Sequence, residues 1–511
     1  MKKSLFISLL AVLLPALAGA ATLKVGASSG VNSLDPHFHN ETPTNSINYN
    51  IFDGLVNFDK DLNPYAVLAE SWKLLDDVTW QFTLRRNVTF HNGNPFTADD
   101  VVWSFNRAKT SEKSGFKGSI SAIKAVTKVD DYTVNVITNG PFPILLRKLT
   151  YLRIMDKESS EGLSDEALGL TPVGTGPYKL VRWQRGQSLV LEANENYFRG
   201  KPAIDKVEVR PLTNDATRVA AMLSGAVQLI NRVPVRDVDR IKANPQMQFF
   251  MRPGLRLIYL QMDHQREKSP YVEGVAKNPF LDVRVRQALY YGIDEAAIVK
   301  HIMGGYAVAA DQYYPVAVNG HDPALTRPAY DPEKAKSLLK AAGYPDGFTV
   351  TLDSPNDRYI NDEKIAQAVA SSLAKIGITV KVNAIPKASF FPKANDADSS
   401  FNLIGWSCGD GDGSAFLDGC VHTYDQEKGY GRYNGGRYSN PKVDELIEAS
   451  ARVLDAAERD KLLVDAMHLA LVEDQNIIPL HYQVDLYAVS KKVEMAPRAD
   501  DYLYFYDMRL K

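Results

Sequence analysis

Cysteine is scarce in this sequence, and so are the patterns that mark common enzyme classes. Only two of the 511 residues are cysteines, and nine histidines are spread along the chain without a dense cluster. The sequence has no HExxH helix, and we expect no serine-nucleophile elbow, so a zinc peptidase or a serine hydrolase has little support. We therefore expect no bound metal, no other cofactor and no enzymatic activity.

An excess of either charge is also missing. The formal net charge is −2, which gives no electrostatic basis for a nucleic-acid partner, because such partners usually meet a basic patch. Long apolar runs are absent after the first 20 residues, so we expect no membrane-spanning helix in the rest of the chain. At this length the chain should fold as two to four units.

The first 20 residues do resemble an export signal. Lys2 and Lys3 precede a short apolar run, and Ala18 and Ala20 stand at the spacing that a signal peptidase recognises. We expect cleavage after Ala20 and a mature protein in the periplasm. No cysteine follows at the start of the mature chain, which argues against a lipid anchor there.

The stretch WSCGDGDGSAFLDGC, Trp406 to Cys420, concentrates the chemically distinctive residues of the chain. It contains both cysteines, and two aspartates lie between glycines. In an exported protein two cysteines so close together predict a disulfide ring, Cys408 to Cys420. The aspartates are open to two interpretations: they bind a cation such as an ammonium group, or they only shape a surface turn.

The order of predicted elements indicates two α/β regions. Residues 57–174 alternate like the strands of a small mixed domain, and a compact apolar strand at 255–262 ends the first region. Residues 349–385 read as strand, loop, helix and strand. A late strand at 477–490 returns towards the first region, so the second region is an insertion and the two crossing segments form a hinge.

Several phrases resemble the periplasmic peptide-type solute-binding proteins of ABC importers, the family 5 cluster of dipeptide, oligopeptide, nickel and glutathione binders. They are SLDPHF, IFDGLVNFDKDLNPYAVLAESWK, FTLRRNVTFHNGNPFTADDVVWSFNR, GTGPYKLVRW, RQALYYGID and IIPLHYQ. The resemblance covers nearly the whole mature chain. It implies an α/β fold of two hinged lobes, of type II and similar to cluster C, with an extra small domain.

The resemblance also implies how the chain is divided. Lobe I is expected at 21–56, 175–262 and 480–511, the small domain at 57–174, and lobe II at 263–479. A small peptide or peptide-like ligand is held between the lobes and passed to an inner-membrane ABC permease, and a monomer suits that role.

In relatives that bind peptides, an aspartate three residues after the tryptophan of this loop receives the ligand's amino terminus. Gly409 occupies that place here, and the nearest carboxylates are Asp410 and Asp412. Arg358 lies where dipeptide binders hold a carboxylate-binding arginine. The candidate ligand-binding residues are therefore Ser33, Arg358, Tyr359, Trp406, Ser407, Asp410, Asp412 and Phe416.

Other functions stay open. The missing aspartate at Gly409 is compatible with a non-peptide ligand in the same fold, such as an opine, a sugar, a metal complex or haem. His422 and His481 are the histidines to consider for a metal or haem carrier. Asp410 and Asp412 could suggest a secreted hydrolase, but they lie in one loop rather than on opposite sides of a substrate.

Overall fold

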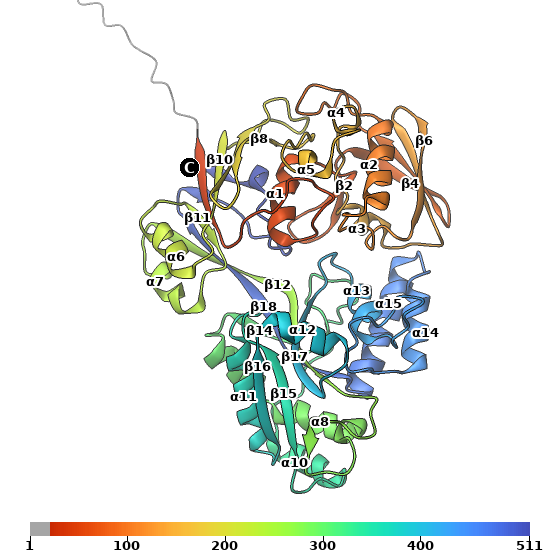
Figure 1. Ribbon diagram of the computed structural model, residues 1–511, viewed down its shortest axis with the longest axis vertical. Helices are drawn as coiled ribbons and strands as arrows, with labels where there is room; N and C mark the ends of the chain where they lie inside the picture. Colours follow the sequence, from red (N-terminus) through yellow and green to blue (C-terminus); the bar gives the residue numbers. More distant parts are fainter. Residues whose placement is uncertain (1–20) are drawn as a thin grey trace, which may run out of the picture.

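Two long antiparallel strands, β12 (Met247–Met262) and β18 (Ile477–Ser490), connect the two lobes of the molecule. The computed structural model describes residues 21–511, so the expected signal peptide lies outside the described residues. In Figure 1 both strands run from the upper lobe, which we call lobe I, to the lower lobe, lobe II. They are the central strands of one 12-stranded sheet that both lobes share. The predicted fold of two α/β lobes joined by crossing strands is confirmed.

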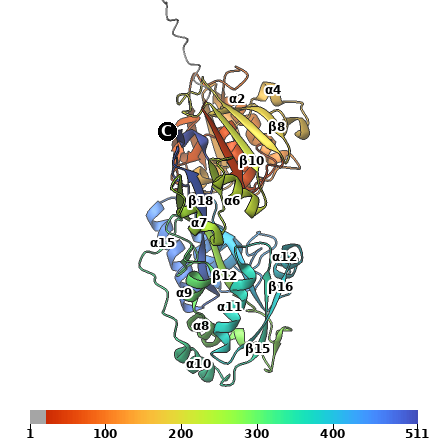
Figure 2. The ribbon, with the colours of Figure 1, turned by 90° about the vertical axis from the view of Figure 1, so that its left-hand side faces the viewer.

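Lobe I contains the two ends of the described chain. Strand β1 (Thr22–Ala27) pairs in parallel with β10 (Lys206–Pro211) and β11 (Leu229–Asn231), and β11 pairs with β18. Figure 2 shows these strands stacked above lobe II, to which β18 leads. Further elements of this part are β8 (Tyr178–Gln184), β9 (Ser188–Ala193), α6 (Asp215–Leu223) and α7 (Val238–Lys242).

Helix α1 (Thr42–Ile51) explains why the last residues stay in lobe I. Its polar side chains are buried, although polar helix faces usually meet water. The Asn50 amide donates to the carbonyl of Leu503 at 2.9 Å and accepts from the N–H of Phe505 at 2.8 Å. Ser46 accepts from the N–H of Leu503 at 2.8 Å. These bonds fasten the C-terminal segment to the N-terminal one.

A separate four-stranded sheet forms the small domain on lobe I. Its strand order is β4-β5-β7-β6, and its apolar face packs on α2 (Ala98–Thr110), which lies beside it in Figure 1. Thr97 caps α2 and forms a capping box with Asp100. The strands are β4 (Ala69–Asp76), β5 (Thr79–Leu84), β6 (Ile123–Asp130) and β7 (Thr133–Thr138). The residue limits given above for the three domains stay predictions.

Lobe II is built around the predicted strand, loop, helix and strand. β15 (Thr349–Pro355) and β16 (Thr379–Ile385) pair in parallel, and α11 (Asp362–Ala374) connects them. β17 (Phe401–Ser407) pairs with β12 and delivers the cysteine-containing loop. The lobe is completed by β13 (Val272–Glu273), α8 (Val283–Gly292), β14 (Ala307–Ala309), α10 (Pro332–Ala341), α12 (Lys387–Asn395), α14 (Pro441–Ser450) and α15 (Ala456–Met467).

Shorter elements connect these parts. They are β2 (Val56–Phe58), β3 (Pro64–Ala66), α3 (Leu145–Leu149), α4 (Lys157–Ser160), α5 (Asp165–Leu168), α9 (Glu295–Ala297), α13 (Ser414–Phe416), β19 (Val493–Glu494) and β20 (Arg509–Leu510). None of the helices in residues 21–511 combines the length and the apolar character that crossing a bilayer requires.

The glycine-rich turn before β8 serves packing. The N–H of Gly176 donates to the carbonyl of Ile51 at 2.9 Å, and β8 rather than a helix follows the turn. A side chain at Gly174 would collide with the Ile51 carbonyl oxygen. Glycine is needed at this position because the turn and the end of α1 approach backbone to backbone.

Replacing Gly174 with alanine should therefore destabilise lobe I. We expect Gly174→Ala to lower the free energy of unfolding by roughly 1–3 kcal/mol, the usual effect of forcing extra volume into a packed site. Urea denaturation of the mature protein measures this. The matched control is Gly118→Ala, where an added Cβ would meet nothing within 4 Å; equal effects of the two changes would contradict the close-approach explanation.

Candidate ligand-binding site between the lobes

A bulge in β12 lies where the strand passes between the lobes. Pro253 pairs with Val484 and Leu257 pairs with Tyr482, so the residues from Gly254 to Arg256 lie opposite the single residue Gln483. Such bulges re-aim side chains away from the ladder. Here Gly254, Leu255 and Arg256 line a cavity of about 710 Å³.

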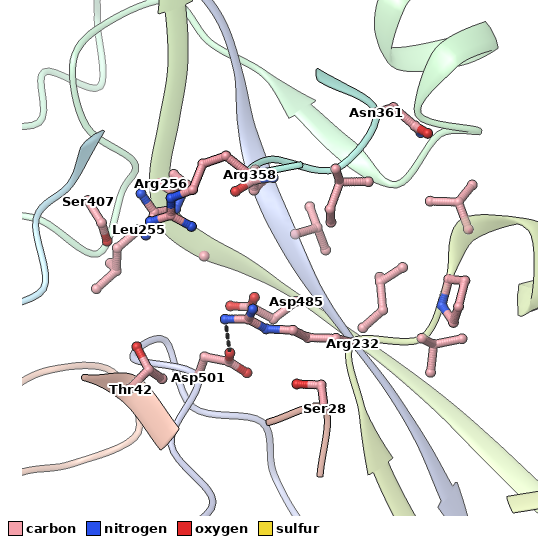
Figure 3. Close-up of a pocket in the computed structure, with 18 of the residues that line it drawn as sticks. Ser28, Thr42, Arg232, Leu255, Arg256, Arg358, Asn361, Ser407, Asp485 and Asp501 are labelled. Carbon is pink, nitrogen blue, oxygen red and sulfur yellow. Dashed lines mark ion pairs between the residues drawn. The ribbon is translucent and has the colours of Figure 1, made fainter. Parts of the chain in front are cut away.

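Both lobes and the hinge strands contribute to the wall of this cavity. Lobe I supplies Ser28 and Thr42, and lobe II supplies Arg358, Asn361 and Ser407, as the close-up in Figure 3 shows. A cavity of this volume lies within the 300–1,000 Å³ that small-ligand sites usually have. A ligand bound here would contact both lobes at once.

Two arginines with no acidic partner define one end of the cavity. Neither Arg256 nor Arg358 makes a side-chain hydrogen bond or an ion pair with any of residues 21–511, and in Figure 3 their guanidinium groups lie near each other. Both lie beside the ring of Tyr359, at 6.0 Å and 5.3 Å from its centroid. Burial, together with the positive charge of Arg358, lowers the pKa of Arg256 to about 10. The end of the cavity is therefore positively charged and suited to an anion.

Carboxylates from β18 and the C-terminal segment lie across the cavity. Asp501 forms an ion pair with Arg232 at 3.6 Å and accepts a hydrogen bond from the Tyr487 hydroxyl at 2.5 Å. Burial and the neighbouring Asp501 raise the pKa of Asp485 well above its usual range. The cavity thus has a basic end and an acidic side.

The two aspartates of the Trp406–Cys420 loop are already neutralised by the protein. Asp412 is fully buried and receives two hydrogen bonds from Arg459, at 2.8 Å and 2.7 Å. Burial alone would raise the pKa of Asp412, but the bonds from Arg459 outweigh it and hold the pKa at about 2. Asp410 accepts from the Lys148 ammonium at 2.6 Å. Both side chains lie outside the cavity lining, and the prediction that either aspartate meets a ligand's ammonium group stays a prediction.

The Lys148 contact joins the lobes. Lys148 belongs to α3, which lies on the side of lobe I facing lobe II in Figure 1. Its neighbour Arg147 donates to the backbone carbonyl of Asp410 and to the Asn319 side chain, each at 3.1 Å. The aspartate loop therefore serves as an interlobe contact.

The structure does not show the predicted disulfide ring. Cys408 and Cys420 are separate buried thiols. Both belong to the hydrophobic core that contains Phe416, and the Cys420 thiol is hydrogen-bonded with the Tyr259 hydroxyl. Packing therefore holds the loop without a covalent link.

The remaining predicted residues divide between cavity and core. Arg358 and Ser407 line the cavity. Tyr359 is mostly buried, and its hydroxyl bonds to the backbone of Gly405. The others lie outside the lining: Phe416 stacks on Tyr313, Trp406 packs on Tyr433, and Ser33 accepts a hydrogen bond from the N–H of Asp35.

Sequence reasoning missed Arg232, Arg256, Asp485 and Asp501. One signal was available for Arg256, a charged residue inside the apolar strand LRLIYLQM. A charge in a buried strand usually has a partner or a function. The acidic residues gave no such signal.

The residues considered for other functions lie elsewhere. His422 stacks on Tyr430, and His481 is completely buried, which lowers its pKa to about 4; neither lines the cavity. The letters GASSG at 26–30 match a serine-hydrolase elbow, contrary to expectation. However, a bend rather than a helix follows β1, and no histidine lines the cavity beside Ser28.

Comparison with known proteins agrees with this geometry. Residues 63–428 match the bacterial extracellular solute-binding proteins, family 5. The chain belongs to this family. The family is one of solute-binding proteins, and an interlobe cavity lined by both lobes is where this member would hold its solute.

Individual relatives cover most of the chain. The glutathione-binding protein GsiB of Pectobacterium atrosepticum is 29% identical over 451 residues, which cover 86% of this chain and 85% of the relative. The heme-binding protein A of Haemophilus influenzae is 29% identical, with coverage of 89% and 85%. The solved structure of the periplasmic binding protein DppA from Helicobacter pylori with the peptide STSA has a TM-score of 0.77 and 27% identity, covering 96% of this chain and 98% of that one.

The raised pKa of Asp485 predicts that the stability of the protein depends on pH. The pKa of Asp485 is raised in the folded protein. At pH values between the usual aspartate pKa, near 4, and the folded pKa, the protein therefore takes up a proton when it folds. The free energy of unfolding consequently falls as the pH rises through this range. Asp485→Asn removes this penalty. We expect the melting temperature of the unliganded variant to exceed that of the wild type at pH 8 and to approach it at pH 4.5, measured by calorimetry. The same difference at both pH values would contradict the assignment.

Proposed function

We propose that this family 5 solute-binding protein is the periplasmic substrate-binding component of an ABC importer. It is exported with its signal peptide removed after Ala20 and works as a monomer without a cofactor or enzymatic activity. It captures a small peptide or peptide-like ligand between its lobes and delivers it to an inner-membrane permease. The single observation that carries the proposal is the cavity at the β12 bulge, with Arg358 free to bind an anion.

A zwitterion matches the charges of this cavity. Arg358 would bind a carboxylate as a charge-assisted pair. The ammonium group would face Asp485 and Asp501, which line the cavity from β18 and the C-terminal segment. The ligands named for two relatives support a peptide-like ligand, because one relative is named for glutathione and the structure of another was solved with a peptide.

Capture requires the lobes to move relative to each other. β12 and β18 are the long strands of the described chain that belong to both lobes, so bending at their irregular pairing would open and close the cavity. The contact between Lys148 and Asp410 would break on opening, because it joins the lobes outside the hinge.

A non-peptide ligand is the second candidate. Both aspartates of the Trp406–Cys420 loop are paired within the protein, so neither is free to receive an amino terminus. This favours an acidic non-peptide such as an opine. Haem and metal complexes have less support, because the cavity lining contains no histidine, cysteine or methionine.

Peptide binding can be tested by thermal shift. A mixture of di- and tripeptides should raise the melting temperature of the mature protein, because a ligand that binds only the folded state stabilises it. Arg358→Gln should abolish most of this shift while the unliganded melting temperature stays close to that of the wild type. A shift with opines or sugars but not with peptides would replace the first candidate with the second.

A further inference from the structure

Arg256 and Arg358 are unusual in sharing one cavity without a counter-ion. Arg256 enters from the β12 bulge, and Arg358 from the loop between β15 and α11. Their backbones belong to different elements, yet Figure 3 shows their side chains converging on one end of the cavity. Two like charges held together in this way repel each other, and a negative charge on a ligand would relieve the repulsion.

The other charges of the lining, which include the cation Lys364, leave this excess uncompensated. Arg218 pairs with Asp215 at 2.7 Å, and Arg232 pairs with Asp501 at 3.6 Å. Arg236 lies 3.5 Å from Asp237. Asp500 is committed to Arg498 through two hydrogen bonds, at 3.0 Å and 2.6 Å.

The last carboxylate of the lining, Asp485, acts on Arg256 through its charge but does not pair with it. Asp485 makes no hydrogen bond or ion pair with Arg256 or Arg358, and Gly254 leaves room for its carboxylate at the bulge. In Figure 3 it lies on the side of Arg232 rather than between the two arginines. Neither Arg256 nor Arg358, which form the basic end of the cavity, is therefore paired with a carboxylate of the described chain.

A single carboxylate on the ligand would not pair with both arginines of this end. A guanidinium binds a carboxylate through two parallel hydrogen bonds, so a single carboxylate satisfies one arginine in its best geometry and leaves the second cation partly buried and unpaired. An unpaired charge withdrawn from water is costly. A ligand with two anionic groups would satisfy both arginines.

We propose that the ligand carries two carboxylates or equivalent anionic groups, and that Arg256 binds the second of them and sets the preference for such ligands. This inference deepens the proposed function and rests on it. Arg358 then contributes to binding any carboxylate ligand, whereas Arg256 distinguishes a diacid from a monoacid of the same shape.

Two pairs of matched ligands test the proposal. The first pair is the dipeptide Ala-Glu and its neutral analogue Ala-Gln, and the second is the opine-type diacid N-(1-carboxyethyl)-alanine and its monoamide. Titration calorimetry with the mature protein should show at least about tenfold tighter binding of the diacid in the pair that binds, the factor expected for one added charge-assisted contact. Arg256→Gln should bring the affinity of the diacid close to that of the monoacid.

The control variant is Arg236→Gln, which removes a cavity arginine that already has Asp237 beside it. It should keep the preference for the diacid. Equal affinities within the pair that binds, or no binding of either pair, would overturn the inference. A preference seen only with the opine pair would support the inference and reject the peptide form of the proposed function, so the two can fail separately.

Discussion

The antiparallel pairing of β12 with β18 is the interaction on which the rest of the molecule depends. These strands join the lobes through one sheet, and the irregular pairing between Pro253 and Leu257 interrupts their ladder between the lobes. A regular ladder would direct alternate side chains into the cores on either side. The bulge instead directs Arg256 into the cavity, so the proposed hinge also places a proposed binding group. Hinge and site are consequences of the same local backbone geometry.

Ion pairs within the chain determine which charged side chains remain free to bind a ligand. Asp410 and Asp412 pair with Lys148 and Arg459, and the Asp410 pair joins the two lobes. The buried pair of Asp412 and Arg459 holds the loop in the place where a disulfide was expected, since losing either partner would leave a buried charge. With the loop's carboxylates occupied, the unpaired arginines dominate the electrostatics of the cavity.

Local patterns predicted the fold better than the site. The segment from β15 through α11 to β16 depends on residues near each other in sequence, and the apolar pattern of 477–490 revealed the returning strand. The partners of Asp410 and Asp412 are 262 and 47 residues away, so their neutralisation could not be predicted. Arg256 depends on a bulge set by pairing with a strand more than 200 residues later. Arg358 was predicted from its position, which matched a family pattern.

The central claim is that the lobes enclose an acidic solute at the arginine end of their shared cavity. Native mass spectrometry of the protein purified from its own periplasm tests this most directly, because a co-purified ligand is weighed and then identified. The account predicts a mature chain beginning at Ala21 with one small bound molecule that carries at least two acidic groups. A bound molecule that is neutral or cationic would contradict it.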